Sequence, residues 1–185
     1  MHMPIFGKSL DQASVVKELN VEGEQLLEKN NFINKGRIVD AKALQQKQKL
    51  AIMPFKAGAN VEASDELDRV ALMIIKGISD AFLRSQDGNH GHFQILTAEN
   101  FSEADLIVRG HITDLISPSK IRRLLPLKAK KTLGVAGKIL KSETGEVVLI
   151  FNDREASDDT QDDYSQIGYR IGKNIGEFIL SGLSQ

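Results

Sequence analysis

The sequence predicts an α/β (α+β) two-layer sandwich, with a mixed sheet of about five strands packed against two main helices. Two long segments, 64–86 and 160–183, carry apolar residues at helical spacing. Short segments rich in β-branched and other apolar residues precede the first helix and fill the region between the two. Helices placed among strands in this way favour a sheet that buries one face against a helical layer.

The first 48 residues give a weaker signal. Partial apolar stripes over 9–29 and 38–47 indicate two short helices, and Gly23 interrupts the first. We therefore expect residues 1–48 to form an N-terminal helical or partly mobile extension outside the core. Residues 49–185 are expected to form the α/β domain.

The domain begins with a strand over 50–55, a short apolar run that ends near Pro54 because proline cannot continue a sheet ladder. Ser64 is a suitable N-cap for the first main helix, and the acids after it favour a helix start. The apolar stripe of this helix consists of Leu67, Val70, Ala71, Ile74, Ile75, Ile78 and Phe82. A strand over 93–97 and one helical turn over 99–104 are expected to follow.

Three strands and a helix complete the domain. One face of a strand over 105–116 carries Leu106, Val108, Gly110, Ile112 and Ile116, with Asp114 breaking the pattern. Strands over 132–141 and 146–155 flank the loop 142–145 and form a hairpin. The last helix is expected over 160–183, where Thr160 and Asp163 make a capping box with Asp in place of the usual Glu.

Composition excludes several classes of protein. The chain has 185 residues with 24 Lys and Arg against 25 Asp and Glu, and this balance disfavours a dedicated nucleic-acid binder. The absence of cysteine excludes disulfides, thiolate-held metals and cysteine nucleophiles. The longest apolar run, 70–75, is too short to span a membrane, and residues 1–10 lack the apolar region of a signal peptide.

Motifs for catalysis and cofactors are missing from the sequence. The segment Gly7-Lys8-Ser9 lacks the first glycine of a phosphate loop, and neither G-x-S-x-G nor G-x-G-x-x-G occurs. His90 and His92 share a glycine-rich turn without a carboxylate or cysteine at ligand spacing. The carboxylates of 153–163 are expected to gather at the start of the last helix, whose dipole favours anions. We therefore predict no catalytic residue, no cofactor and no metal.

Three short sequence motifs, which we call the sequence words, occur in order along the chain. They are 50–55 on the first strand, Ala104-Asp105-Leu106-Ile107-Val108-Arg109-Gly110-His111-Ile112-Thr113 on the third, and Glu143-Thr144-Gly145-Glu146-Val147-Val148 at the hairpin. In their order and spacing these words resemble bacterial envelope lipoproteins of the CsgG-like and TolB amino-terminal-like group. The resemblance covers residues 49–183.

The resemblance implies a non-enzymatic binding or scaffold module of a cell-envelope assembly in the periplasm. Such proteins are often tethered to the outer membrane through a lipidated amino-terminal Cys, which for this chain would lie upstream of residue 1. The expected partners are envelope proteins, an anionic lipid or glycan surface, or further copies of the chain, and not nucleic acid. The alternative is a cytoplasmic enzyme or small-ligand-binding α/β domain that uses Arg109, His111 and Asp114 on the sheet.

The connection between the third and fourth strands is strongly basic. Residues 120–131 include six basic side chains and no acid. A solvated loop is one interpretation, and a contact surface for a partner or for the membrane surface is the other, because leucines accompany the localised charge. The residues of this candidate surface are Lys120, Arg122, Arg123, Leu124, Leu125, Leu127, Lys128, Lys130 and Lys131.

Gly168, Gly172 and Gly176 recur every four residues on the last helix and form one stripe of small residues. A stripe of this kind lets another backbone approach closely. We expect it to pack on the sheet, and the alternative is self-association between copies.

Overall fold

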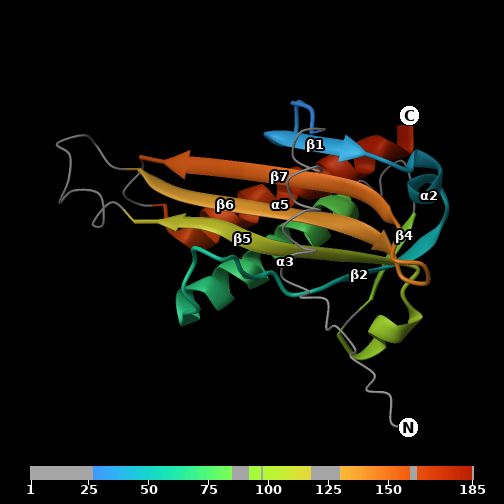
Figure 1. Cartoon of the computed structure of the whole chain (residues 1–185), viewed down its shortest axis with the longest axis horizontal. Coiled ribbons are helices and arrows are strands. Elements are labelled where there is room, and N and C mark those ends of the chain that lie inside the picture. Colours follow the sequence, from blue (N-terminus) through green and yellow to red (C-terminus); the bar gives the residue numbers. More distant parts are fainter. Residues whose placement is uncertain (1–26, 85–91, 97, 118–129, 159–161, 185) are drawn as a thin grey trace, which may run out of the picture.

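The computed structural model of the chain describes residues 27–84, 92–96, 98–117, 130–158 and 162–184 (Figure 1). Its elements in chain order, with η marking a 3-10 helix, are β1 Lys35–Ile38, α2 Ala41–Gln45, β2 Gln48–Ile52, β3 Lys56–Ala57, α3 Asp65–Arg84, β4 Phe93–Leu96, η2 Ala98–Glu103, β5 Leu106–Ile116, β6 Lys131–Lys141, β7 Val147–Ser157, α5 Tyr164–Ser181 and η3 Gly182–Ser184.

One seven-stranded sheet has the order β1-β7-β6-β5-β2-β4, and the short β3 pairs with β5. The strands from β1 to β5 in this order pair antiparallel, whereas β2 runs parallel to both β5 and β4. The long helices α3 and α5 lie behind the sheet in Figure 1 and cover one face. The predicted two-layer sandwich with a mixed sheet is confirmed, and the short strands β1 and β3 add to the strands that were expected.

The core lies between the sheet and the two long helices. Side chains from β5, β6, β7 and α5 that are completely buried there include Val108, Val135, Leu149, Ile167, Ile171 and Ile175. Burying an aliphatic side chain of this size contributes about 1.5–3 kcal/mol. This packing determines which face of each strand turns inward, and the alternate residues consequently turn away from the helices.

The described part of the expected extension belongs to this fold. β1 is the edge strand beside β7, and α2 contacts η3 at the end of the chain. Ile33 and Leu44 are buried in the same core as the long helices. The core therefore reaches back beyond the boundary expected at residue 48. The helix expected over 38–47 is present as the shorter α2, whereas β1 is too short to give a periodic pattern. Most of the helix expected over 9–29 falls outside the described residues.

The prediction of which β5 side chains face the core is wrong near the C-terminal end of the strand. The register against β6 shifts between Ile112 and Asp114, which marks a β-bulge. The extra residue returns Leu115 to the core side, where it packs against buried residues. Ile116 was expected on that side, and the bulge turns it to the opposite face. Asp114 does not interrupt an inward stripe, because after the bulge it lies on the outward face.

The helix caps are partly as predicted. The backbone N–H of Leu67 donates to Ser64 Oγ at 3.2 Å, which confirms Ser64 as the cap of α3. The capping box of α5 lies three residues later than expected. Asp163 is the N-cap, its carboxylate accepts from the Gln166 backbone at 2.8 Å, and Gln166 Oε1 accepts from the Asp163 backbone at 2.9 Å. Asp163 therefore begins the box that it was expected to complete.

Asp105 joins three segments at one end of the sheet. Its carboxylate accepts from the backbone of Lys49 at 2.8 Å, and its own N–H donates to the Lys49 carbonyl at 2.9 Å. The Ser142 N–H donates to the Asp105 carbonyl at 2.8 Å. The start of β5, the start of β2 and the β6–β7 hairpin therefore meet at one residue. Two of the sequence words, 104–113 and 143–148, lie at this junction, so part of their pattern reflects how the sheet is assembled.

Candidate functional site

The sheet face turned away from the helices carries a row of basic side chains. The register aligns Arg37 with Ile150, Ile150 with Lys138, and Lys138 with Arg109. These residues alternate along their strands with core residues, so their side chains turn away from α3 and α5. Lys35 lies two residues before Arg37 on β1 and shares this face. We call Lys35, Arg37, Arg109 and Lys138 the basic sheet face.

The basic sheet face lacks internal compensation. All four side chains are exposed, and none forms an ion pair with another described residue. Arg109 and Lys138 are directly opposite each other on antiparallel strands, where like charges destabilise a sheet. Folding alone therefore gives no reason for this arrangement.

Asp114 is the one carboxylate that the described residues of β1, β7, β6 and β5 place on this face. Its Oδ2 lies 3.8 Å from Arg154 Nε, across Gly134. An exposed pair at this separation contributes at most about 1 kcal/mol. The acid therefore neutralises Arg154 in part and leaves the basic sheet face uncompensated.

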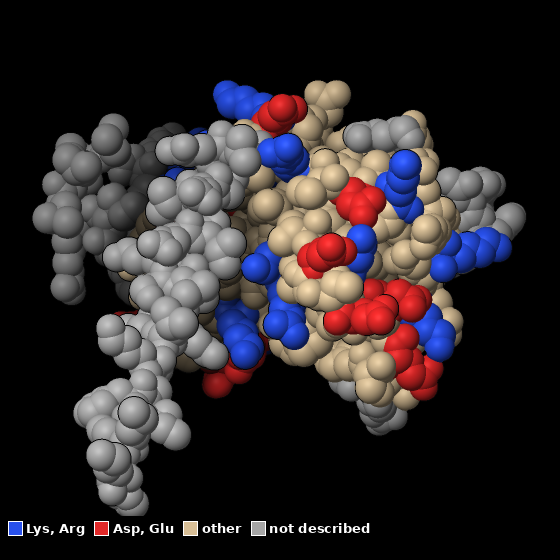
Figure 2. Space-filling view, turned by 45° about the vertical axis from the view of Figure 1, so that its right-hand side comes forward, with Lys and Arg blue, Asp and Glu red and all other residues tan. Residues whose placement is uncertain are grey.

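The end of the sheet at the β6–β7 hairpin has a different charge pattern. Figure 2, which is turned toward that end, shows basic and acidic side chains close together. Lys141 Nζ lies 2.9 Å from Asp40 and 3.0 Å from Glu146, and Lys49 lies 2.8 Å from Glu103. Lys49 and Lys141 thus have carboxylate partners, in contrast to the cations of the basic sheet face.

Arg109, His111 and Asp114, the residues of the alternative enzymatic site, all lie on the outward face of β5. His111 is half-buried, and burial lowers the pKa of its imidazole, which favours the neutral ring. Asp114 accepts a hydrogen bond from Thr113 at 3.4 Å and faces Arg154. Its carboxylate therefore has partners other than the imidazole.

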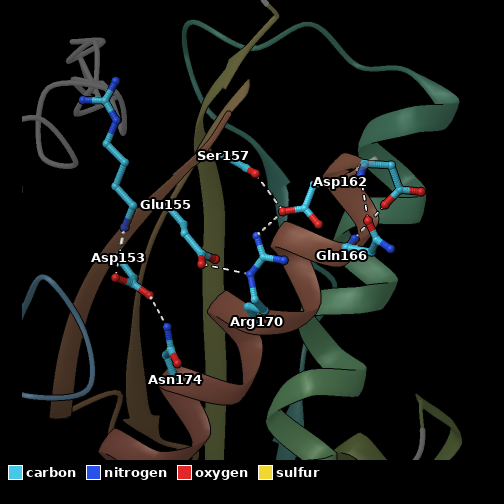
Figure 3. Close-up of polar contacts among 9 residues, drawn as sticks. Asp153, Glu155, Ser157, Asp162, Gln166, Arg170 and Asn174 are labelled. Carbon is cyan, nitrogen blue, oxygen red and sulfur yellow. Dashed lines mark hydrogen bonds and ion pairs between the residues drawn. The ribbon is translucent and has the colours of Figure 1, made fainter. Parts of the chain in front are cut away.

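A polar network joins β7 to the start of α5 (Figure 3). Arg170 donates to Glu155 and to Asp162, both at 2.9 Å, and Ser157 Oγ donates to Asp162 at 2.7 Å. The hydrogen bonds from Arg170 and Ser157 hold the pKa of Asp162 below its ordinary value. Of the carboxylates expected to gather at the helix start, Glu155 and Asp162 thus bind Arg170, while Asp163 caps the helix. The network ties α5 to the sheet.

Asp153 is a buried carboxylate in the same region, with 3% of its surface exposed. Its Oδ1 accepts from the backbone of Asn34 at 3.1 Å and of Arg154 at 3.0 Å, and its Oδ2 accepts from Asn174 Nδ2 at 3.4 Å. Burial raises the pKa of this carboxyl, and the hydrogen bonds oppose that rise. The group links β7, α5 and the segment before β1.

Most of the predicted contact surface lies outside the described residues, namely Lys120, Arg122, Arg123, Leu124, Leu125, Leu127 and Lys128. The two members that the structure describes both have partners. Lys130 lies 3.1 Å from Asp158, and Lys131 donates to the backbone carbonyl of Asp162. These contacts join the start of β6 to the segment between β7 and α5.

The glycine stripe of α5 contacts α3, in place of the sheet contact that was expected. Cβ atoms on Gly168, Gly172 and Gly176 would approach Val70, Ile74 and Ala81 respectively. All three glycines are buried within the chain. The stripe is occupied by α3 and offers no surface to a second copy in this structure.

Metal ligands do not gather in the part of the chain that the structure describes: no three His, Asp or Glu side chains are placed to hold an ion. His92 Nε2 lies 2.6 Å from the Leu44 carbonyl oxygen, so this imidazole is engaged with the backbone near α2. Its neighbour in the predicted turn, His90, lies outside the described residues.

Neither a family model nor a curated protein sequence matches the chain. Among solved structures, the PelC dodecamer from Paraburkholderia phytofirmans has a TM-score of 0.52 at 13% identity, over 80% of this chain and 95% of that one. Protein XCC0632 from Xanthomonas campestris, of the DUF330 family, has 0.46 at 14%, over 76% and 86%. Lipoprotein GNA1162 from Neisseria meningitidis has 0.40 at 10%, over 70% and 95%. The chain thus has a fold similar to that of PelC.

No helix among the described residues combines the length and the apolar character needed to cross a lipid bilayer.

Proposed function

We propose that this chain is a non-enzymatic binding and scaffold module of a bacterial cell-envelope assembly, and that it works as an assembly of several copies. The observation that carries the proposal is the fold similarity to PelC, which extends over 80% of this chain and 95% of PelC. PelC is a dodecamer. A scaffold acts through its surfaces, and the basic sheet face is an exposed, uncompensated surface of the kind that a binding module needs.

A finer assignment rests on the sequence words. Their resemblance to the CsgG-like and TolB amino-terminal-like group supports a periplasmic module, held at the outer membrane by a lipidated Cys upstream of residue 1. Its partners would be envelope proteins, with anionic lipid or glycan as a further ligand of the segment 120–131. Lys130 and Lys131 already contact Asp158 and Asp162 of the same chain. Arg122, Arg123 and Lys128 are therefore the first positions to test there.

The proposal is tested by the mass of the purified chain in solution. Sedimentation velocity at micromolar concentration should give a species that is a multiple of the 20.4 kDa chain. A monomer at every concentration and salt would contradict the assembly. Fractionation of cells that produce the protein from its complete gene should place it with the envelope, and recovery with the cytosol would contradict the location.

The non-enzymatic part has a separate test. The purified chain should not turn over general esterase, phosphatase or glycosidase substrates. Reproducible turnover that is lost in His111→Ala would contradict the proposal and favour the alternative site at Arg109, His111 and Asp114.

A further inference from the structure

The start of α3 carries the opposite charge to the basic sheet face. Glu62, Asp65, Glu66 and Asp68 are all exposed, and none forms an ion pair within the described part of the chain. The helix dipole favours the three acids of the first turn. Glu62 precedes the helix, so the dipole gives less reason for it. We call these four residues the acidic helix start.

The two charged surfaces lie on different layers of the molecule. The acidic helix start belongs to the helical layer. Burial raises the pKa of the Tyr164 hydroxyl at the start of α5, and the charge of Glu66 adds to that rise. The basic sheet face lies on the opposite side of the sheet (Figure 1). Within the described residues of one copy, no ion pair joins the two surfaces.

We propose that the basic sheet face of one copy binds the acidic helix start of a second copy, so that copies associate head to tail. The proposal rests on the proposed assembly of several copies and names the contact that builds it. Each surface supplies four unpaired charges of one sign, and the chain as a whole is nearly neutral at −1. The carboxylates that would balance the basic sheet face are therefore present on the same chain.

A contact between two different surfaces has a geometric consequence. An open assembly of this kind keeps one free surface of each kind at its two ends, so association continues until a ring closes or a filament grows. The opposed pair of Arg109 and Lys138 also gains a role, because carboxylates from the second copy relieve their repulsion. The arrangement that costs stability in one copy is then stabilising between copies.

Two double variants test this contact in the full chain. Arg109→Glu with Lys138→Glu reverses two of the four charges of the sheet face, and Glu62→Lys with Asp68→Lys reverses two of the four at the helix start while keeping Asp65 and Glu66 for the helix dipole. Sedimentation velocity measures association at about 0.1 M and about 1 M salt, where the screening length falls from about 10 Å to about 3 Å. Wild-type association should weaken at the higher salt.

Each double variant alone should associate at least a hundredfold more weakly than wild type, because like charges would face each other. An equimolar mixture of the two should recover association, since the unaltered helix start of the first variant meets the unaltered sheet face of the second, and the reversed residues of the two variants are opposite in charge. The control, Lys42→Glu with Lys47→Glu, makes the same change in net charge as the sheet-face variant, at exposed positions off both surfaces. It should associate like wild type.

The outcomes separate this contact from the assembly itself. If either double variant forms a species of the same mass as the wild-type assembly, or if the mixture fails to associate, the contact is wrong while the proposed assembly stands. A monomeric wild type overturns both. If the reversed face instead abolishes binding to phosphatidylglycerol vesicles and leaves the mass unchanged, the face binds lipid and the contact is wrong.

A milder variant covers the case in which a charge reversal disturbs folding. Arg109→Gln with Lys138→Gln removes the like-charge pair and should be at least as stable as wild type in a thermal melt. It should still associate more weakly than wild type, and association at the wild-type level overturns the proposal.

Discussion

Asp153 makes the free energy of unfolding depend on pH. Burial raises the pKa of its carboxyl above the ordinary 3.8. The folded chain therefore holds this proton more tightly than the unfolded chain does, and the contribution of Asp153 to the free energy of unfolding falls as the pH rises above 3.8. The carboxylate accepts hydrogen bonds from three segments of the chain, and these oppose the effect of burial on its charged form.

Asp153→Asn should change this pH dependence. The amide oxygen can still accept from the backbone of Asn34 and Arg154, and the amide cannot ionise. Urea unfolding should show the variant gaining stability relative to wild type as the pH rises from about 4 to 7, with little difference below that window. Asp158→Asn, at an exposed carboxylate, should not show this rise. A difference between Asp153→Asn and wild type that stays constant with pH would contradict the role of burial.

At the scale of elements, Gly172 is a point of close contact between α5 and α3. A Cβ at this position would overlap the carbonyl oxygen of Ile74, and two further backbone atoms of Ile74 lie 2.9 Å away. Backbone cannot move aside as a flexible side chain can. The spacing of the two helices therefore depends on the absence of a side chain here.

Gly172→Ala should lower the free energy of unfolding by about 1–3 kcal/mol, because the helices must separate to admit the methyl group. Gly168→Ala is the matched control, since its Cβ would meet Val70 atoms at 3.2 Å and needs a smaller adjustment. The higher helix propensity of alanine, worth about 1 kcal/mol, should offset much of that cost. Urea denaturation measures both, and equal losses would contradict the specific contact at Gly172.

At the scale of the whole molecule, the segment before β2 folds with the rest of the chain. Leu44 on α2 is completely buried and belongs to the same core cluster as the long helices. Both tyrosines, Tyr164 and Tyr169, lie on α5, and the chain has no tryptophan. Tyrosine fluorescence therefore reports on the helical layer.

Leu44→Ala should lower the unfolding midpoint seen by tyrosine fluorescence, with a loss of about 2–5 kcal/mol in the free energy of unfolding. Val39→Ala is the control, because Val39 is 50% exposed and should change stability little. A tyrosine transition unchanged by Leu44→Ala would mean that α2 unfolds separately, as the expected boundary at residue 48 implies.

Features that depend on neighbouring residues can be predicted from local sequence patterns. The apolar stripes of α3 and α5, the Ser64 cap and the β6–β7 hairpin all follow from patterns within a few turns of chain. Gly145, at the end of the predicted loop, has a φ of 74°, a left-handed conformation that glycine adopts freely. Local periodicity was sufficient to give the two-layer fold because both long helices and the three long strands are strongly patterned.

The positions at which distant segments meet depend on tertiary contacts. The bulge after Ile112 and the pairing of β1 with β7 depend on contacts across the sheet, so no local pattern encodes them. The basic sheet face has the same origin. Arg109 was already expected on the outer side of its strand, whereas Lys35 and Arg37 lay in a segment expected to stand outside the core. A strand's alternation separates its two faces, but strand order and register decide which charges become neighbours.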